Sequence, residues 1–382
     1  MIFTFEALNA KKGDSLILTW GAPDKLRHLV IDGGPEGVWK QSLLPRLLEL
    51  REGHELEDDE PLPLEMVMIS HIDDDHINGI LDLLREIERT SPAAAYRIKT
   101  LWHNSFDEII GNGPAEMKSR LASLENEVDE ISDRIDHSRA IVASVGQGRK
   151  LRAAAQGLHI LLNGGFVGLV MAKRKRVTAP IAGDLKFHII GPSEDRLQAL
   201  MAAWEKDVKK NPSTASVASF VDKSVANLSS IVVVAEFAGK TMLLTGDARG
   251  DDILAGLENA GFIDDGDTGT CHFDVLKMPH HGSDRNMTED FLRRITADHY
   301  IFSADGEHDN PDRGTIDMLG VARKGHSFLA HFTNETMKNK AGKDIGKTVK
   351  AALNKHGIAG MARFRAKNEL GIRVDLLDPL PF

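Results

Sequence analysis

Five side chains that commonly bind metal ions lie within six residues, from His71 to His76. The set consists of two histidines and three aspartates. The apolar run at residues 64–70 predicts a strand before them, and the apolar spacing over residues 77–90 predicts an amphipathic helix after them. We therefore expect these side chains at a strand-to-helix turn, where residues at alternate positions converge.

This turn carries enough ligands for two metal ions. His71 and Asp73 could hold one ion, and Asp75 and His76 could hold a second. Imidazole and carboxylate together favour zinc, manganese or iron, and the carboxylates shift the preference towards manganese. The competing interpretation is structural, because aspartates are also common caps at the start of a helix.

Three other segments combine strand-like runs with polar residues that could reach the same site. The first lies near the N-terminus, and Asp32 in it is expected to orient the site or cap a turn. The second predicts a hairpin that ends at Asp247, and the third a strand that ends in His280 and His281. The three segments are residues 13–34, 229–247 and 274–283.

The motif His71-x-Asp73-x-Asp75-His76 resembles the signature of the metallo-β-lactamase superfamily, His-x-His-x-Asp-His on such a turn. With Asp73 in place of the second histidine, it is similar to the branch that contains the hydrolase domain of the bacterial competence DNA-uptake channel. Together with the three segments above, the resemblance covers most of residues 1–320, and residues 13–34 resemble the family's first hairpin. It implies a four-layer αββα sandwich of the α/β class.

The resemblance also implies a ligand set for two divalent ions, zinc or manganese. Asp247 would bridge the ions, and one of the two adjacent histidines would complete the shells. The superfamily's lone histidine has no match here, and Asn227 stands where the branch tends to have asparagine, so one ion is expected to bind less tightly. His159 and His188 are expected to be core or sheet-face residues, and His103 a loop residue on the surface. The implied metal ligands are His71, Asp73, Asp75, His76, Asp247, His280 and His281.

These residues predict a metal-dependent hydrolase, in which bound metal lowers the pKa of a water and hydroxide is the nucleophile. Asp75, Asp247 and His281 are the predicted catalytic residues. A phosphodiesterase or nuclease is favoured, and hydrolysis of a carbon ester, lactone or lactam is the alternative. A metal-binding scaffold protein without catalysis is a third interpretation. Predicted substrate contacts are Lys277, Ser283 and His308.

The chain of 382 residues is longer than one hydrolase core of about 200–250 residues needs. We expect a hydrolase domain at residues 1–320, with a helical insertion at about 105–145, and an extension at 321–382 packed on the core. The insertion carries a heptad seam over residues 117–135, which could pack on the core or against a second subunit, and a homodimer is favoured. The seam consists of Met117, Leu121, Leu124, Val128, Ile131 and Ile135.

Smaller features between the insertion and the second hairpin are also predicted. They are a turn at residues 146–148, strands at 158–162 and 166–171, a basic hairpin tip at 173–176, and a loop at 211–223 that could cover the metals.

Charge and composition limit the function classes. The net charge of −10 opposes an extensive nucleic-acid surface, although six lysines between residues 338 and 355 could face phosphate or simply form a solvated helix face. No apolar stretch is long enough to cross a bilayer, and Met1 does not begin a signal peptide. With a single cysteine, Cys271, the expectation is a soluble cytoplasmic protein without an internal disulfide or a membrane partner.

Overall fold

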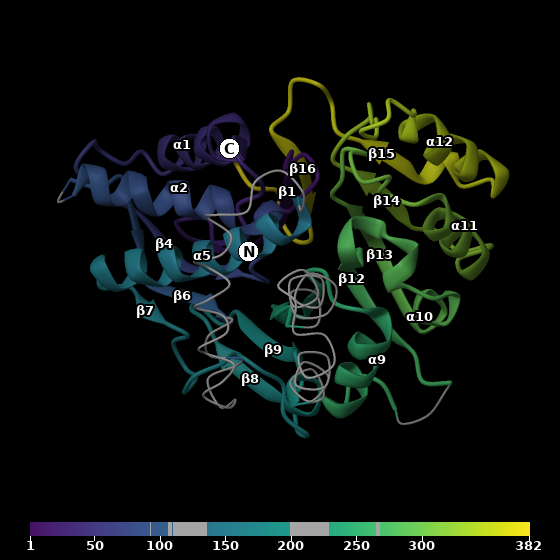
Figure 1. Cartoon of the computed structure of the whole chain (residues 1–382), viewed down its shortest axis with the longest axis horizontal. Coiled ribbons are helices and arrows are strands. Elements are labelled where there is room, and N and C mark those ends of the chain that lie inside the picture. The colour runs from purple at the N-terminus through teal and green to yellow at the C-terminus, as the bar shows by residue number, and fades with distance from the viewer. Residues whose placement is uncertain (92, 106–108, 110–135, 199–228, 265–267) are drawn as a thin grey trace.

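The protein folds into two β-sheets packed face to face, with helices on both outer faces (Figure 1). The computed structural model describes residues 1–91, 93–105, 109, 136–198, 229–264 and 268–382. Three buried clusters of apolar side chains separate four layers, since one lies between the sheets and one lies beneath the helices on each side. The predicted αββα sandwich is confirmed.

The first sheet has the strand order β16-β1-β2-β3-β4-β6-β7, and β5 also pairs with β4. Its strands β1, β2 and β3 form an antiparallel meander, and β4 runs parallel to β3. The predicted N-terminal hairpin is therefore confirmed as β2 and β3. The strands are β1 (Ile2–Leu8), β2 (Leu16–Ala22), β3 (Lys25–Ile31), β4 (Leu62–Ile69), β5 (Tyr96–Ile98), β6 (Thr100–His103), β7 (Leu161–Leu162) and β16 (Gly371–Asp375).

The second sheet has the order β15-β14-β13-β12-β11-β10-β9-β8. The predicted hairpin before Asp247 is β10 and β11, and from β11 to β15 the strands run parallel. The strands are β8 (Val177–Pro180), β9 (Lys186–Gly191), β10 (Val232–Phe237), β11 (Lys240–Leu244), β12 (Cys271–Lys277), β13 (Ile295–Phe302), β14 (Leu329–Phe332) and β15 (Ala362–Phe364).

The helices cover the outer faces of the two sheets (Figure 1). Apolar side chains of α1, α2 and α5 share the buried cluster beneath the first sheet, and those of α9 to α12 share the cluster beneath the second. The helices are α1 (Leu44–Gly53), α2 (Asp74–Thr90), α5 (Asp136–Gly157), α9 (Gly250–Asn259), α10 (Glu289–Arg294), α11 (Arg313–Ala322) and α12 (Ile345–Lys355).

Local sequence explains the strand and helix that flank the acidic turn. Nearly every residue of β4 is buried, because the strand lies between α2 on one side and the second sheet on the other. In α2, the buried residues Ile77, Ile80, Leu84 and Ile87 recur every three or four positions and form one apolar face. Both elements confirm the predictions for residues 64–90.

Several predictions between the two hairpins are wrong. Residues 146–148 do not form a turn but lie within α5, and residues 166–171 form no strand. The basic residues 173–176 lie in a loop before β8 and not at a hairpin tip. The heptad seam at 117–135, the loop at 211–223 and Asn227 lie outside the described residues.

Residues 321–382 contribute to both sheets. They supply β14 and β15 to the second sheet, and β16 pairs with β1 in the first. Across the ranges that the structure describes, no helix has both the length and the apolar character needed to cross a membrane.

Candidate metal centre

The predicted ligands meet where strands of both sheets end. His71 follows β4, and Asp75 and His76 lie in the first turn of α2. Asp247 follows β11 in the second sheet, and His281 follows the neighbouring parallel strand β12. Because parallel strands present their carboxyl ends at the same edge of a sheet, residues far apart in the sequence are brought to one place.

Asp247 lies at the centre of this group. Its Oδ2 atom is 3.7 Å from Nε2 of His71 and 3.6 Å from Nε2 of both His280 and His281. Its Oδ1 atom is 3.5 Å from Nε2 of His76. A single carboxylate therefore faces four imidazoles, as a bridging ligand would.

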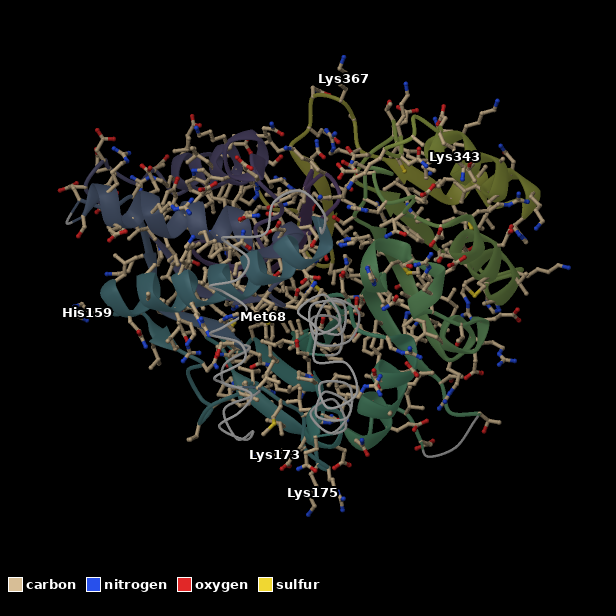
Figure 2. All side chains as sticks on the ribbon, viewed as in Figure 1. Met68, His159, Lys173, Lys175, Lys343 and Lys367 are labelled. Atoms are coloured by element: carbon tan, nitrogen blue, oxygen red, sulfur yellow. The ribbon has the colours of Figure 1, made fainter. Side chains whose placement is uncertain are left out.

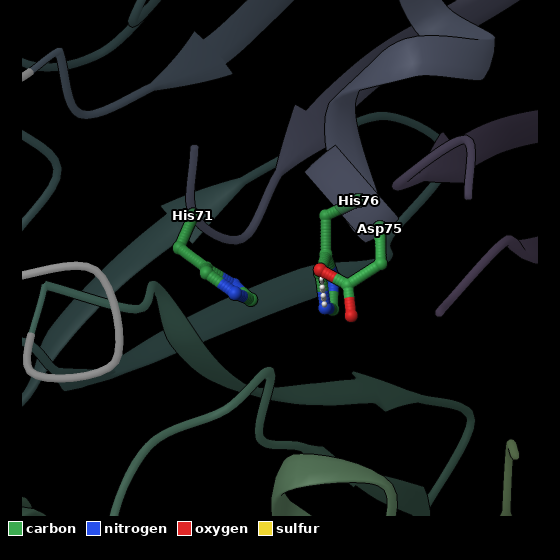
Figure 3. Close-up of side chains that lie close together, drawn as sticks. All are labelled: His71, Asp75 and His76. Carbon is green, nitrogen blue, oxygen red and sulfur yellow. Dashed lines mark ion pairs between the residues drawn. The ribbon is translucent and has the colours of Figure 1, made fainter. Parts of the chain in front are cut away.

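Two further carboxylates border the same space. Asp75 lies 3.8 Å from Nε2 of His76 and 3.6 Å from Nε2 of His281. Figure 3 shows the side chains of His71, Asp75 and His76 directed into this space from the turn between β4 and α2. Asp73 Oδ2 lies 3.6 Å from Nε2 of His71. Asp73 is the N-cap residue of α2, but its side chain makes no capping hydrogen bond, so the capping interpretation does not explain it.

These separations fit a bound metal ion. Two ligand atoms that each lie about 2.1 Å from one tetrahedral ion are about 3.4 Å apart. The Nε2 atoms of His71, His76 and His281 and the Oδ1 atom of Asp247 are buried and have no hydrogen-bond partner among the described residues. Leaving such atoms unpaired costs about 1–3 kcal/mol each. Convergent lone pairs of this kind fit a divalent cation.

Second-sphere hydrogen bonds orient two of the histidines. Nδ1 of His76 donates to Asp32 Oδ2 at 2.8 Å, and the backbone N–H and hydroxyl of Ser70 donate to Asp32 at 2.7 and 2.6 Å. Nδ1 of His281 donates to the carbonyl of Ser303 at 3.0 Å. Each histidine thereby turns Nε2 towards Asp247, in the tautomer that metal binding requires.

A buried ion pair lies behind His281. Lys277 Nζ is 2.5 Å from Asp14 Oδ2, and each side chain is 1% exposed. Asp14 Oδ1 in turn lies 3.4 Å from Nδ1 of His281. The predicted contact between Lys277 and substrate is therefore wrong, because the ammonium is enclosed by protein and pairs with Asp14.

The backbone after β12 adopts an uncommon conformation. His280, His281 and Gly282 have φ values of 47°, 56° and 87°, so three successive residues are left-handed. This conformation costs about 1–3 kcal/mol for each non-glycine residue. It turns both histidines towards Asp247, which explains why the strain is retained at this place.

The carboxylates and histidines of the centre shift one another's pKa. Burial alone would raise the pKa of Asp247 and Asp75, but the neighbouring histidines hold both well below the usual range. Burial alone would lower the pKa of His281, but Asp247 and Asp14 raise it to about 10. Burial lowers the pKa of His71 to about 3. Strong mutual perturbation in a buried cluster is typical of functional sites.

A pocket of about 50 Å³ opens beside the histidines. Lys12, Asp75, His280, His281 and His308 line it. The structure places His308 at this pocket, and its contact with substrate stays a prediction. Ser283 is buried beyond the left-handed segment, and its backbone N–H donates to the carbonyl of His280.

The remaining histidines differ in how well the sequence predicted them. His188 lies on β9 and bonds Thr178 and Glu236, which confirms a sheet-face histidine. His159 is exposed at the rim of the molecule (Figure 2), so its predicted core or sheet-face position is wrong. His103 is fully buried and not a surface residue, because α5 packs over the end of β6.

The sequence missed Lys12 and did not assign Asp14 a role. Lys12 belongs to no motif, and its place at the pocket depends on the meeting of two sheets. Asp14 stands in a Gly-Asp-Ser segment that predicts only a turn, and its partner Lys277 is more than 260 residues away. The burial of the Asp14 carboxylate can be recognised only in the folded structure, not from the sequence.

The basic segments do not form one surface. Lys173 and Lys175 project from one end of the molecule, and Lys343 lies near α12 at another (Figure 2). Lys340, Lys343, Lys350 and Lys355 each lie within 3.6 Å of a carboxylate oxygen, which favours a solvated, paired face. A phosphate-facing patch remains a prediction.

No family model and no curated protein sequence matches this chain. Among solved structures, zinc-bound PqqB from Methylobacterium extorquens is 12% identical over 98% of this chain and 100% of its own, with a TM-score of 0.39. A proposed metal-dependent hydrolase from Parabacteroides distasonis is 10% identical over 86% of this chain and 98% of its own, with a TM-score of 0.32. A protein of unknown function from Enterococcus faecalis is 12% identical over 97% of this chain and 71% of its own, with a TM-score of 0.31. The distances between candidate ligands given above belong to this chain and are not taken from these structures.

Proposed function

We propose that the protein is a metal-dependent hydrolase. The observation that carries the proposal is the convergence of three buried, unpartnered imidazole Nε2 atoms on the carboxylate of Asp247. A structural role for such a cluster would leave several buried polar atoms without compensation. A scaffold without catalysis explains the ligands but not the pocket beside them.

The residues fall into two ligand groups that share Asp247. Asp75, His76 and His281 would hold one ion, and His71, Asp73 and His280 the second. A bound divalent ion would supply Lewis acidity and lower the pKa of water. Asp32 and the Ser303 carbonyl keep His76 and His281 in the binding tautomer. His280 is 29% exposed, more than the other three histidines, so the second group is the one open to solvent.

We favour a phosphodiester as the substrate. Lys12 lines the pocket, and its ammonium lies 3.2 Å from Glu307, close enough to exchange that partner for a substrate anion. His308, on the same pocket, is half-exposed and could donate to a leaving oxygen. The aspartate at position 73 and the His280-His281-Gly282-Ser283 segment support the same substrate class through the resemblance.

The test is hydrolysis of a chromogenic phosphodiester with zinc or manganese added, and bound metal is measured separately. Wild type is compared with Asp247→Ala and with Asp24→Ala, which removes an exposed aspartate between β2 and β3. We expect metal-dependent turnover in wild type and Asp24→Ala, and a loss of more than about 100-fold in Asp247→Ala.

Two other outcomes have different meanings. If the protein binds metal and hydrolyses lactones but not phosphodiesters, it is a metal-dependent hydrolase whose substrate is a lactone and not a phosphodiester. Absence of both metal and turnover would contradict the proposed function.

A further inference from the structure

A second cavity, of about 600 Å³, lies away from the metal centre. It is formed by β1 and β16 of the first sheet, β14 and β15 of the second, and the start of α1. The loop that joins β15 to β16 passes over this region, and Figure 2 labels Lys367 on it. The volume is within the range of small-molecule sites, about 300–1,000 Å³. No predicted metal ligand lines it.

Arginines dominate the lining of this cavity. Four arginines and three glutamates line it, so it carries one net positive charge in a chain whose net charge is −10. Two of the glutamates are already engaged: Glu6 lies 3.0 Å from Arg46 and 3.2 Å from Arg373, and Glu49 lies 2.7 Å from Arg46. Two guanidinium groups, those of Arg363 and Arg365, remain beside the third glutamate, Glu369.

Arg363 and Arg365 donate only to backbone carbonyls in the part of the chain that the structure describes. Nη1 of Arg363 bonds the carbonyls of Gly360 and Ala362. Arg365 bonds the carbonyl of Thr333 through Nε, and its Nη1 bonds two carbonyls of its own loop. These bonds fix the planes of the two groups, and among the described residues neither group donates to a side-chain carboxylate. Burial lowers the pKa of Arg365, and the nearby charge of Glu369 opposes that shift.

Arg46 provides a third, buried donor. Its side chain is 3% exposed, and its Nη2 atom has no hydrogen-bond partner within the ranges that the structure describes. A buried guanidinium N–H without an acceptor is costly, because the group is charged. An oxyanion in the cavity would supply an acceptor near the arginines that line it.

We propose that this cavity binds a small organic anion through a phosphate or carboxylate group, held by Arg363 and Arg365 next to Arg46. Guanidinium groups recognise both oxyanions through paired N–H donors. Leu8, Phe364, Leu370 and Ile372 also line the cavity and would contact the apolar part of the ligand. Both faces of the Phe364 ring are engaged, by Phe332 and Lys350, so the ring offers its edge and does not stack on a base.

Isothermal titration calorimetry tests this proposal with three probes: inorganic phosphate, adenosine monophosphate and citrate. The proteins are wild type, Arg363→Gln, Arg365→Gln and Asp247→Ala, with Arg97→Gln as a matched control for an exposed arginine on β5. Thermal unfolding checks that each variant folds. Arg363→Gln keeps the test valid if Arg365→Gln does not fold, because Arg363 is exposed and bonds only its own turn.

We expect at least one probe to bind wild type, Arg97→Gln and Asp247→Ala with equal affinity. The same probe should bind Arg363→Gln at least about tenfold more weakly. Tighter binding of phosphate and the nucleotide than of citrate would identify a phosphate site, and the reverse order a carboxylate site. Binding that is lost in Asp247→Ala but kept in Arg363→Gln would place the anion at the metal centre and overturn the proposal. So would the absence of binding of all three probes to wild type. Neither result depends on whether the metal centre hydrolyses a phosphodiester.

Discussion

At the scale of single residues, the metal centre depends on side chains that would not touch the metal. Asp32 accepts three hydrogen bonds, one from His76 and two from Ser70, and is buried at the end of β3. Burial raises the pKa of Asp32, while its bonds to His76 and Ser70 favour the ionised form. The carboxylate thus holds the His76 ring in one orientation.

Replacement of Asp32 by asparagine should weaken metal binding. The amide can accept only one of these bonds well and can present an N–H to His76, which favours the wrong tautomer. We expect the affinity for zinc to fall about 10–100-fold, measured by competition with a chromogenic chelator. Asp24→Asn serves as the control. An unchanged affinity in Asp32→Asn would show that His76 is held by packing alone.

A histidine pair outside the metal centre makes stability depend on pH. Nε2 of His28 lies 2.6 Å from Nε2 of His54, and Nδ1 of His28 bonds the hydroxyl of Thr19. Burial and the neighbouring His54 lower the pKa of His28 to about 3. The unfolded chain has the ordinary value near 6.5, so it binds a proton that the folded protein does not. The contribution of neutral, buried His28 to the free energy of unfolding is fully present above pH 6.5 and is lost as the pH falls towards 3.

Between pH 7 and pH 5 this histidine should lower the free energy of unfolding by about 2 kcal/mol. Urea unfolding of wild type and His28→Gln at both pH values measures the effect. Between pH 7 and pH 5, the free energy of unfolding of the variant should fall by about 2 kcal/mol less than that of wild type. His326→Gln, which removes an exposed histidine, should behave as wild type. Equal losses in His28→Gln and wild type would contradict the assignment.

At the scale of elements, the start of α2 is held against the loop after β3 by backbone contact. The N–H of Gly33 donates to the carbonyl of His76 at 2.6 Å, and the N–H of Gly79 donates to the carbonyl of Gly34 at 3.2 Å. A Cβ atom on Gly79 would lie 2.0 Å from the carbonyl oxygen of Gly33. This contact sets the position of the turn that carries Asp75 and His76.

Gly79→Ala should therefore destabilise the protein, although alanine is the better helix former by about 1 kcal/mol. The clash is with backbone atoms, which cannot move aside without displacing Asp32 and the first turn of α2. We expect a lower unfolding temperature together with weaker metal binding. Gly157→Ala, at the end of α5, is the control and should be neutral or stabilising, because no atom of the described residues lies within 4 Å of its new Cβ. A stable Gly79→Ala with normal metal binding would refute the contact.

The elements also show what sequence patterns can predict. The strand β4, the helix α2 and the hairpin of β10 and β11 were predictable, because each depends on local apolar spacing and turn residues. The cluster of candidate metal ligands was predictable because four of its members stand in one short motif. Residues 146–148 were misjudged because glycine propensity was outweighed by packing: Gln147 bonds Asn78 of α2, which keeps α5 continuous. The pair of Asp14 and Lys277 could not be predicted, since it forms only when two sheets meet.

At the scale of the whole molecule, the C-terminal residues complete both sheets. Strands β14 and β15 extend the second sheet beyond β13, and β16 covers the edge of β1. Phe332 and Phe364, on these added strands, stack on each other and join the same buried cluster as Phe302. Removing the segment would expose apolar faces and two unpaired strand edges.

A chain that ends at residue 320 should therefore not fold as an independent hydrolase domain. We expect it to aggregate or to lose cooperative thermal unfolding, because exposed strand edges pair with other chains. Size-exclusion chromatography and circular dichroism measure both properties against the full chain. A soluble, monomeric fragment with cooperative unfolding would support a domain boundary near residue 320.

The pairing of β1 with β16 has a consequence for the order of folding. Thr4 pairs with Asp375, and the amino group of Met1 lies 2.6 Å from Asp378. β1 and its outer neighbour β16 lie more than 360 residues apart in the sequence, so this edge of the first sheet cannot close until the residues between them have been synthesised.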